Sequence, residues 1–312
     1  MDDTTKQINL TEGLNSLRPK TKEPPSTRVL DSWIAHAETD TFGERGGRLA
    51  WLVASTIVTA MLQQVVDGTG KSRFSLKGGT LLQHRLGLAA RATKDLDGIV
   101  RGDIEDFVAA MDKCLQQSWG PIDFRRTELE IINTPAKLIK PRSFEVILIL
   151  RGQTWRRIKV EISPDEGNAG SSQEEFAAPS LAGFGLPTPD YLVGLAMSYQ
   201  IAQKVHAASD PHDPPEFINE RPRDVIDLLL LKELVETTGE PNNAEIKSAI
   251  EDIFTARGKE ALALGRPVRT WPIQIIAHSH WNADYTSAAT SVDIELTLDE
   301  AVGQVNAWLG SL

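Results

Sequence analysis

The sequence has 312 residues, of which 41% are hydrophobic and 24% charged, and its formal net charge is −10. This length exceeds one average domain, and the composition is ordinary for a globular protein. No apolar run approaches the roughly 20 residues of a membrane span, and the polar start MDDTTKQ does not resemble a signal peptide. The single Cys114 excludes an internal disulfide and a cysteine metal cluster. We therefore expect a cytoplasmic protein without a membrane anchor.

Charge is distributed unevenly along the chain. Residues 1–159 carry 24 basic and 19 acidic side chains, whereas residues 160–312 carry 9 and 24. The segment Lys71–Arg101 has seven basic and two acidic residues, and Lys137–Lys159 has seven and one. A net charge of −10 argues against generic nucleic-acid binding, but clusters of this kind can neutralise phosphates locally.

In chain order, the pattern predicts an N-terminal arm, a region of mixed helices and strands, and a helical C-terminal region. Residues 1–27 are polar and contain three prolines, so we expect an arm without a core. Apolar spacing and turn residues predict the elements that follow. The predicted helices are 28–38, 47–66, 103–117, 188–207, 221–231 and 243–254, and a capping box at 297–300 opens a last helix. The predicted strands are 72–76, 124–132, 142–150 and 155–162. Residues 164–180 are predicted to form a loop, and residues 257–288 an irregular segment. No helix fits between the last three strands, so we expect them to pair antiparallel.

The segment Leu76–Val100 organises the rest of the chain. Gly78-Gly79-Thr80 precedes a run with helical apolar spacing, and Asp95-Leu96-Asp97 follows it. We interpret the segment as a strand end, a glycine turn, a helix and a second strand. In that strand Asp95 and Asp97 project to the same side, and two adjacent carboxylates need a cation between them. Mg²⁺ accepts carboxylate oxygens and keeps positions for substrate phosphates, and a glycine turn at a helix N-terminus suits a phosphate group.

Two residues of the C-terminal half indicate a second charged site. Lys204 lies on an otherwise apolar helical run, where burying its charge is costly unless it meets an anion. That anion is a triphosphate in the functional interpretation; alternatively, the side chain extends to the surface. Asp227 precedes four leucines, so we expect it to point inward and hold Lys204. We expect His206 to be packed and hydrogen-bonded, and His278 and His280 to pack within a loop.

Four segments resemble the motifs of the AbiEii/AbiGii-type nucleotidyltransferase toxins of bacterial toxin–antitoxin systems, which include the mycobacterial MenT group. K-G-G-T-x-L followed by R-x-T-K-D-L-D is similar to the first motif, and Lys159-Val160-Glu161-Ile162 to the second. Residues 201–207 are similar to the third motif, A-x-K-L/V-H-A, and residues 221–228 to the fourth, R-x-x-D-x-x-D-L. The resemblance covers residues 74–234.

The resemblance implies a bilobed α+β enzyme with a nucleotide cleft between its lobes. A mixed β-sheet with flanking helices would occupy 28–165, including the N-terminal helices, and a helical C-terminal lobe 186–312. The enzyme would transfer NMP from an NTP, with Mg²⁺ or Mn²⁺, to an RNA acceptor, the 3′ end of tRNA, and so block translation. The implied catalytic residues are Asp95, Asp97, Glu161, Lys204 and Asp227; the metal ligands Asp95, Asp97 and Glu161; and the nucleotide-binding residues Gly78, Gly79, Thr80, Arg91 and Lys204, with Arg85 as a weaker phosphate candidate.

The resemblance also implies a cognate antitoxin. Thr93 matches a position that carries a hydroxyl in related toxins, beside the metal acids. Phosphorylating it would place a dianion next to two carboxylates and should repel a metal-bound nucleotide.

Two other functions stay open. The acidic second half of the chain favours a small-molecule or protein acceptor over tRNA. A nucleotide-binding partner module with the fold but without turnover is the other alternative, and the complete set of acids together with Lys204 argues against it.

Overall fold

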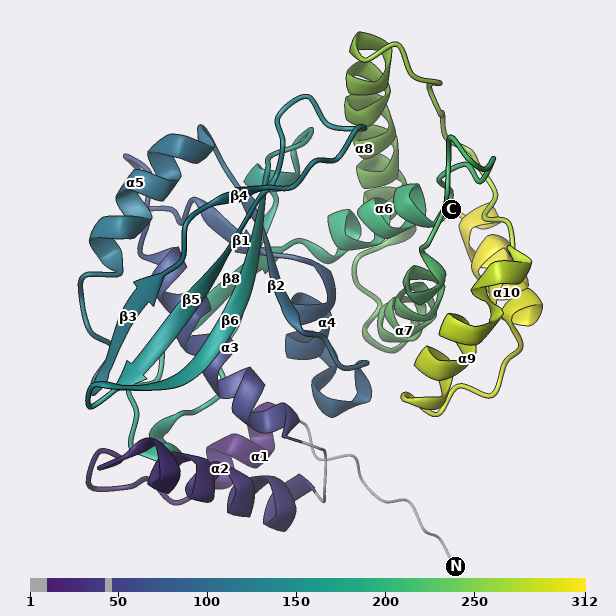
Figure 1. The fold of residues 1–312 in the computed structure, drawn as a ribbon. Helices are drawn as coiled ribbons and strands as arrows, with labels where there is room; N and C mark the ends of the chain where they lie inside the picture. Colours follow the sequence, from purple (N-terminus) through teal and green to yellow (C-terminus); the bar gives the residue numbers. More distant parts are fainter. Residues whose placement is uncertain (1–9, 43–46) are drawn as a thin grey trace, which may run out of the picture. The chain divides into compact units, whose positions relative to one another are not determined.

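The computed structural model describes residues 10–42 and 47–312 and has a mixed α/β architecture (Figure 1). The chain divides into two compact units. The first comprises the described residues up to 134 together with 139–164 and 173–194, and the second comprises 135–138, 165–172 and 195–312. The fold class predicted from the sequence, a mixed sheet with flanking helices and a helical C-terminal part, is confirmed.

One mixed sheet forms the centre of the first unit. Its strands are β1 (Phe74–Leu76), β2 (Asp95–Val100), β3 (Ile122–Arg126), β4 (Glu130–Ile131), β5 (Arg142–Leu150), β6 (Gln153–Pro164), β7 (Gln173–Ala177) and β8 (Tyr191–Leu195). They follow the order β3-β5-β6-β2-β1-β8-β7, with β4 also on β5. As expected, β3 and β6 each pair antiparallel with β5, because no helix lies between these strands in the chain. Strand β2 pairs parallel with β6 and antiparallel with β1.

The helices of the first unit within the described residues are α1 (Leu10–Ser16), α2 (Thr27–Phe42), α3 (Arg48–Gln63), α4 (Gly78–Leu86) and α5 (Ile104–Cys114). Helix α3 is buried at every position from Leu52 to Leu62, as its continuous apolar sequence requires, and it packs on β1 and β6. The Asp103 side chain caps α5 by accepting the Asp106 N–H, as predicted.

The second unit is helical. Its helices are α6 (Met197–Ala208), α7 (Pro222–Thr238), α8 (Asn243–Ala263), α9 (Asn282–Thr290) and α10 (Leu298–Gly310). Helix α6 packs on α7 and α8, and α7 packs on α9 and α10. The predicted capping box opens α10, with reciprocal bonds between Thr297 and Glu300. A search of the described helices finds none with the length and apolar character of a bilayer-crossing segment.

Three predictions of local structure were wrong. Residues 191–195 form strand β8 instead of the first turns of a helix, because Leu192 and Leu195 are buried in the sheet and Gly194 lies against Leu81 and Phe176. The predicted loop 164–180 contains β7, and the predicted irregular segment 257–288 contains the end of α8 and most of α9. In each case tertiary packing overrides local propensity.

The predicted arm was also wrong in part. Residues 10–16 form helix α1, in which Leu14 is buried, whereas residues 1–9 lie outside the described part of the chain. The first unit also extends further than predicted, because β7 and β8 add residues 173–194 to its sheet.

We predict that Gly98→Ala destabilises the first unit. A Cβ at Gly98 would lie 2.0 Å from Cε2 of the buried Phe74, so the ring must move, at a cost of about 1–3 kcal/mol in the free energy of unfolding. Gly303→Ala is the control, because this exposed position within α10 has open space around it and should gain about 0.5–1 kcal/mol. Chemical denaturation measures both; an unchanged Gly98→Ala midpoint would contradict the prediction.

Candidate active site

The predicted acids lie on one face of the two central strands. The parallel register places Asp95 beside Lys159 and Asp97 beside Glu161. Leu96 and Val160, which alternate with them, are fully buried, whereas all four charged residues are at least partly exposed. Because paired positions of adjacent strands point to the same side, Asp95 and Asp97 project together, as predicted, and Glu161 shares their face.

The glycine turn before α4 lies directly against these acids. The Lys77 N–H donates to the Asp97 carbonyl oxygen at 3.0 Å. Gly78 has φ +63°, and a Cβ there would lie 2.3 Å from Asp97 Oδ2. A Cβ at Gly79 would lie 3.0 Å from Thr93 Oγ1 and 3.6 Å from Arg91 Nη2. Because the backbone N–H groups of a helix's first turn are directed toward its N-terminus, the N–H groups of Gly79 and Thr80 can donate to an anion at this turn.

Two threonine hydroxyls converge on the start of β2. Thr80 Oγ1 donates to the Asp95 carbonyl oxygen at 2.8 Å, and Thr93 Oγ1 donates to the same oxygen at 3.4 Å. Thr80 is fully buried. In this structure the Thr80 hydroxyl therefore fixes the backbone of Asp95, and nucleotide binding by Thr80 stays a prediction.

Lys159 is the residue that sequence reasoning missed. Its Nζ lies 2.5 Å from Glu161 Oε1 and 3.6 Å from Asp95 Oδ1, and the hydrogen bond to Glu161 is the main cause that raises the pKa of the Lys159 ammonium. Strand alternation alone places Lys159 and Glu161 on one face, so the signal was present in the motif.

The three acids are not gathered into one metal centre. Throughout the described part of the chain, no group of three His, Cys, Asp or Glu residues is close enough to hold a metal ion. The predicted three-ligand set is therefore not formed in this arrangement, because the Glu161 carboxylate is turned to Lys159. Asp95 and Asp97 still offer hard oxygen donors beside a turn that a Cβ would fill, and this donor set fits Mg²⁺.

Lys204 forms a buried ion pair in the second unit. Its Nζ lies 2.5 Å from Asp227 Oδ2 and 2.8 Å from Asp224 Oδ1. The side chain of Lys204 is 8% exposed and that of Asp227 0%. The expected pairing of Lys204 with Asp227 is thus present, and the alternative of a lysine that extends to the surface is wrong.

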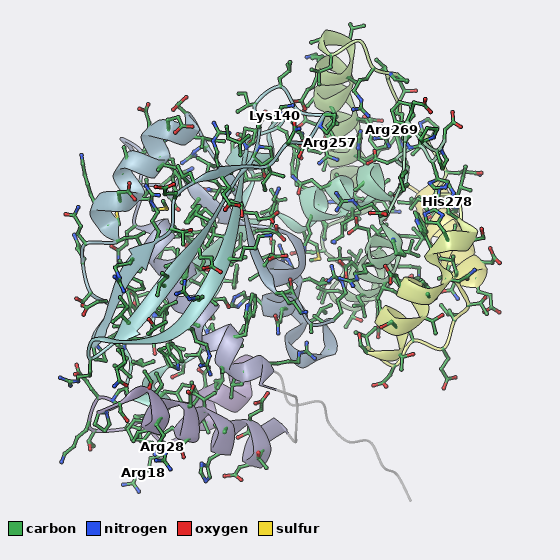
Figure 2. All side chains as sticks on the ribbon, in the orientation of Figure 1. Arg18, Arg28, Lys140, Arg257, Arg269 and His278 are labelled. Atoms are coloured by element: carbon green, nitrogen blue, oxygen red, sulfur yellow. The ribbon has the colours of Figure 1, made fainter. Side chains whose placement is uncertain are left out.

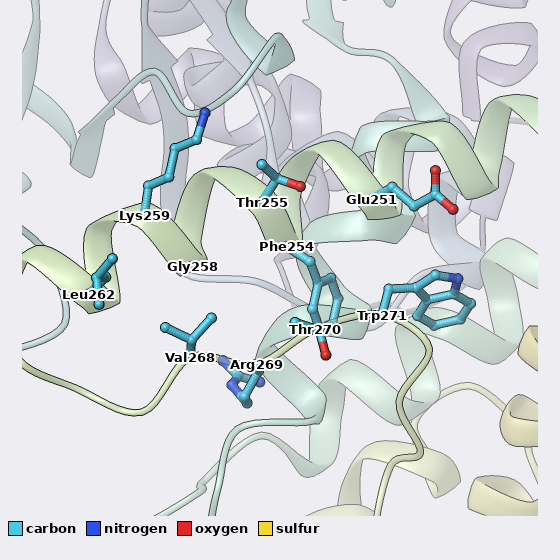
Figure 3. Close-up of a pocket in the computed structure, with 10 residues that line it drawn as sticks. All are labelled: Glu251, Phe254, Thr255, Gly258, Lys259, Leu262, Val268, Arg269, Thr270 and Trp271. Carbon is cyan, nitrogen blue, oxygen red and sulfur yellow. The ribbon is translucent and has the colours of Figure 1, made fainter.

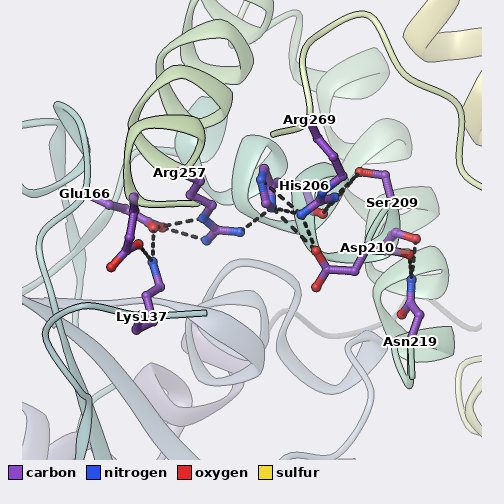
Figure 4. Close-up of polar contacts among 10 residues, drawn as sticks. Lys137, Glu166, His206, Ser209, Asp210, Asn219, Arg257 and Arg269 are labelled. Carbon is purple, nitrogen blue, oxygen red and sulfur yellow. Dashed lines mark hydrogen bonds and ion pairs between the residues drawn. The ribbon is translucent and has the colours of Figure 1, made fainter. Parts of the chain in front are cut away.

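A polar network surrounds His206, two residues after Lys204 on α6 (Figure 4). Arg257 and Arg269 each approach His206 Nδ1 at 2.9 Å. Arg257 also binds Glu166, which accepts further bonds from Lys137 and Gln203. Burial, together with the two guanidinium charges, holds the pKa of His206 far below its usual range. His206 is therefore a neutral, packed histidine, as expected.

The histidines of the C-terminal half also pack as expected. His278 and His280 contact each other and the ring of His212, with ring centroids 4.1–5.6 Å apart. His280 additionally bonds the carbonyl oxygen of Asn219.

Most basic side chains of the segment Lys137–Lys159 already face acceptors of this chain. Arg142 pairs with Glu105, Arg156 with Asp31, Arg157 with Glu145, and Lys137 with Glu166 and Glu260. Lys140, labelled in Figure 2, donates to the Thr134 carbonyl oxygen. In the other basic segment, Arg85 pairs with Glu174. These charges are locally compensated and are less available to RNA phosphates than the sequence indicated.

A pocket of about 440 Å³ lies within the second unit along α8 (Figure 3). Phe254, Gly258 and Leu262 line it from the helix, and Val268 and Trp271 from the following segment. None of the residues predicted from the sequence belongs to it, so it is separate from the acids and from Lys204.

Comparison with known proteins identifies the family. The family model described as "Nucleotidyl transferase AbiEii toxin, Type IV TA system" matches residues 60–305. The chain belongs to the AbiEii family. It is therefore a nucleotidyltransferase of a toxin–antitoxin system, with an NTP as substrate and a cognate antitoxin as partner. The match extends well beyond the motif region 74–234. No curated protein matches the chain in sequence.

Solved structures that show a likeness to this chain include the following three. They are MenT4, a nucleotidyltransferase toxin from Mycobacterium tuberculosis H37Rv (17% identity, 93% of this chain and 99% of that chain, TM-score 0.46), JHP933 from Helicobacter pylori (14%, 86% and 92%, 0.43), and an antigenic nucleotidyltransferase-like protein from Paracoccidioides brasiliensis (13%, 69% and 94%, 0.36).

We predict that Gly78→Ala in this AbiEii toxin abolishes transfer through displacement of Asp97. The new Cβ must push the Asp97 carboxylate from its position, and a shift of about 1 Å at a catalytic group lowers turnover roughly 100-fold. Gly152→Ala is a matched control, because Gly152 has φ +79° with open space around it. Both variants carry the same backbone strain of about 1–2 kcal/mol, so equal activity in the two would contradict the role given to the close contact.

We predict that removing one partner of the buried Lys204–Asp227 ion pair destabilises the protein more than replacing both partners. Lys204→Met leaves the buried Asp227 carboxylate without this ammonium and should cost about 3–5 kcal/mol in the free energy of unfolding. The Lys204→Met/Asp227→Leu double variant should be more stable than Lys204→Met. Lys204→Met, Asp227→Leu and the double variant should lose transfer to a similar extent, since residues that act as one unit are not additive. Denaturation and single-turnover assays decide this; losses of activity that multiply would show separate roles.

Proposed function

We propose that this nucleotidyltransferase transfers NMP from an NTP to an RNA acceptor, the 3′ end of tRNA, in a reaction that depends on Mg²⁺ or Mn²⁺ and blocks translation. The observation that carries the metal-dependent chemistry is the contact between the glycine turn and the acids, with Gly78 against Asp97 and the first turn of α4 beside them. Transfer to an RNA end rests on the family motifs.

The residues of this chain then have distinct parts. Asp95 and Asp97 would hold the metal ion, which when bound neutralises phosphate charge and orients the reacting groups. Backbone N–H groups at Gly79 and Thr80 bind phosphate oxygens, and Arg91, next to Gly79, adds a positive charge. Lys204, held by Asp227, neutralises the pyrophosphate that leaves when the acceptor hydroxyl attacks the α-phosphate. Positioning and charge account for catalysis of this kind.

A small-molecule or protein acceptor is the second candidate. The observation that favours it is the pairing of Arg142, Arg156 and Arg157 with carboxylates. An RNA phosphate must displace those partners before it releases counterions and gains affinity, whereas a small acceptor needs no extended basic face.

Regulation by the antitoxin through phosphorylation of Thr93 remains part of the proposal. Thr93 Oγ1 lies against Gly79 and donates to the Asp95 carbonyl oxygen. A phosphate there would lose that bond and add negative charge beside the acids.

The acceptor is tested by incubating the full chain with each α-labelled NTP, Mg²⁺, total RNA and a protein extract. We expect label on tRNA, abolished by chelator and reduced at least roughly 100-fold in Asp95→Asn and Asp97→Asn, whose melting temperatures stay near that of the wild type. Thr93→Glu should likewise lose most activity, and Thr93→Ser should keep it.

Other outcomes separate the candidates. Label confined to protein or small molecules would support the second candidate. Nucleotide binding without any transfer would support the partner module. Activity of Asp95→Asn at the wild-type level would remove the metal from the mechanism.

A further inference from the structure

Lys159 lies on β6, which has β2 on one side and β5 on the other. On its face of the sheet, Asp95 lies opposite it on β2 and Glu145 on β5. Arg157, two residues earlier on β6, takes Glu145 at 3.1 Å. The Lys159 ammonium is directed instead to Glu161 and Asp95. On this face of β6, Arg157 therefore pairs with Glu145, whereas Lys159 pairs with Glu161 and Asp95.

The charges around the glycine turn are only partly balanced by this lysine. Asp95, Asp97 and Glu161 carry three negative charges on one face, and Lys159 supplies one positive charge to two of them, Asp95 and Glu161. A divalent cation supplies two. An ammonium and a divalent cation that use the same carboxylate oxygens repel each other at short range, so the two cannot hold Asp95 and Glu161 at once.

The pair is also open to exchange. The side chains of Lys159 and Asp95 are 46% and 45% exposed, and ion pairs of such exposure contribute little to stability. Solvent ions reach the carboxylates, and the lysine can swing away without uncovering a buried charge.

We propose that Lys159 is an internal competitor of the divalent cation: it holds the carboxylates of Asp95 and Glu161 until the metal-bound nucleotide displaces it. This inference rests on the proposed metal dependence and adds to it a positioning residue. Lys159 holds Asp95 and Glu161 without the metal and raises the metal concentration that the enzyme needs. Release of Glu161 by Lys159 is then the event that lets Glu161 turn toward Asp97, its neighbour in the sheet register.

The test is direct measurement of metal affinity for the full chain, with Mn²⁺ as the probe and the EPR signal of free Mn²⁺ as the readout. Lys159→Met removes the competing charge and keeps the length of the side chain, so Mn²⁺ should bind about tenfold more tightly than in the wild type, the scale of one unit charge about 5 Å from a divalent ion in water. Lys159→Arg keeps the charge and should match the wild type within about threefold.

Arg157→Gln is the matched control for charge. It removes one positive charge from the same face of the same strand, but from a residue that pairs with Glu145, so its Mn²⁺ affinity should change less than that of Lys159→Met. Melting curves give a second readout: added Mn²⁺ should raise the melting temperature of Lys159→Met more than that of the wild type. If Lys159→Met folds poorly, Lys159→Gln carries the same expectation.

The failures are distinguishable. Unchanged or weaker Mn²⁺ binding in Lys159→Met, with binding lost in Asp95→Asn, would overturn the role of Lys159 and leave the proposed function intact. An equal gain in Arg157→Gln would reduce the effect to overall charge and would also overturn it. Absence of Mn²⁺ binding in every variant, the wild type included, would overturn this inference together with the proposed metal dependence.

Discussion

The parallel pairing of β2 with β6 is the constraint on which the candidate site depends. This pairing sets Asp95 beside Lys159 and Asp97 beside Glu161, and a slip of either strand by one residue would turn its two charged side chains into the core. Leu96 and Val160, both fully buried, prevent that slip because they need the opposite face. The hydrophobic pattern of the two strands therefore fixes the face on which the charged groups lie. Contacts between the charged groups are not needed for this placement.

The glycine turn adds a second constraint on the same carboxylates. Glycine is required at position 78 for two reasons: φ is positive there, and a Cβ would collide with Asp97. The hydroxyls of Thr80 and Thr93 donate to the Asp95 carbonyl oxygen. Backbone and side chain of the two acids are thus held by different residues. Such division keeps Asp95 and Asp97 in place even though their carboxylates are partly exposed.

Both units hold lysines in contact with more than one acid, but with different consequences. Lys204 is buried between Asp224 and Asp227, and a pair in that environment is costly to break. Lys159 is exposed between Asp95 and Glu161, where water and salt weaken the pair. The first is a permanent feature of the helical unit, and the second is suited to exchange with an incoming cation.

The sequence by itself determined the elements whose signals are local and the residue types of the site. Apolar spacing predicted β5 and α5, strand alternation predicted the shared face of Asp95 and Asp97, and a capping box predicted α10. The apolar residues around Lys204 and after Asp227 indicated that these two pair. Tertiary structure decided where local signals were ambiguous. Residues 191–195 form a strand because they pair in parallel with β1. Packing of α4 and β6 against β2 decides two contacts of Asp95, one from the Thr80 hydroxyl and one from Lys159. Hydrogen bonds between segments far apart in sequence follow from packing, and no local pattern encodes them.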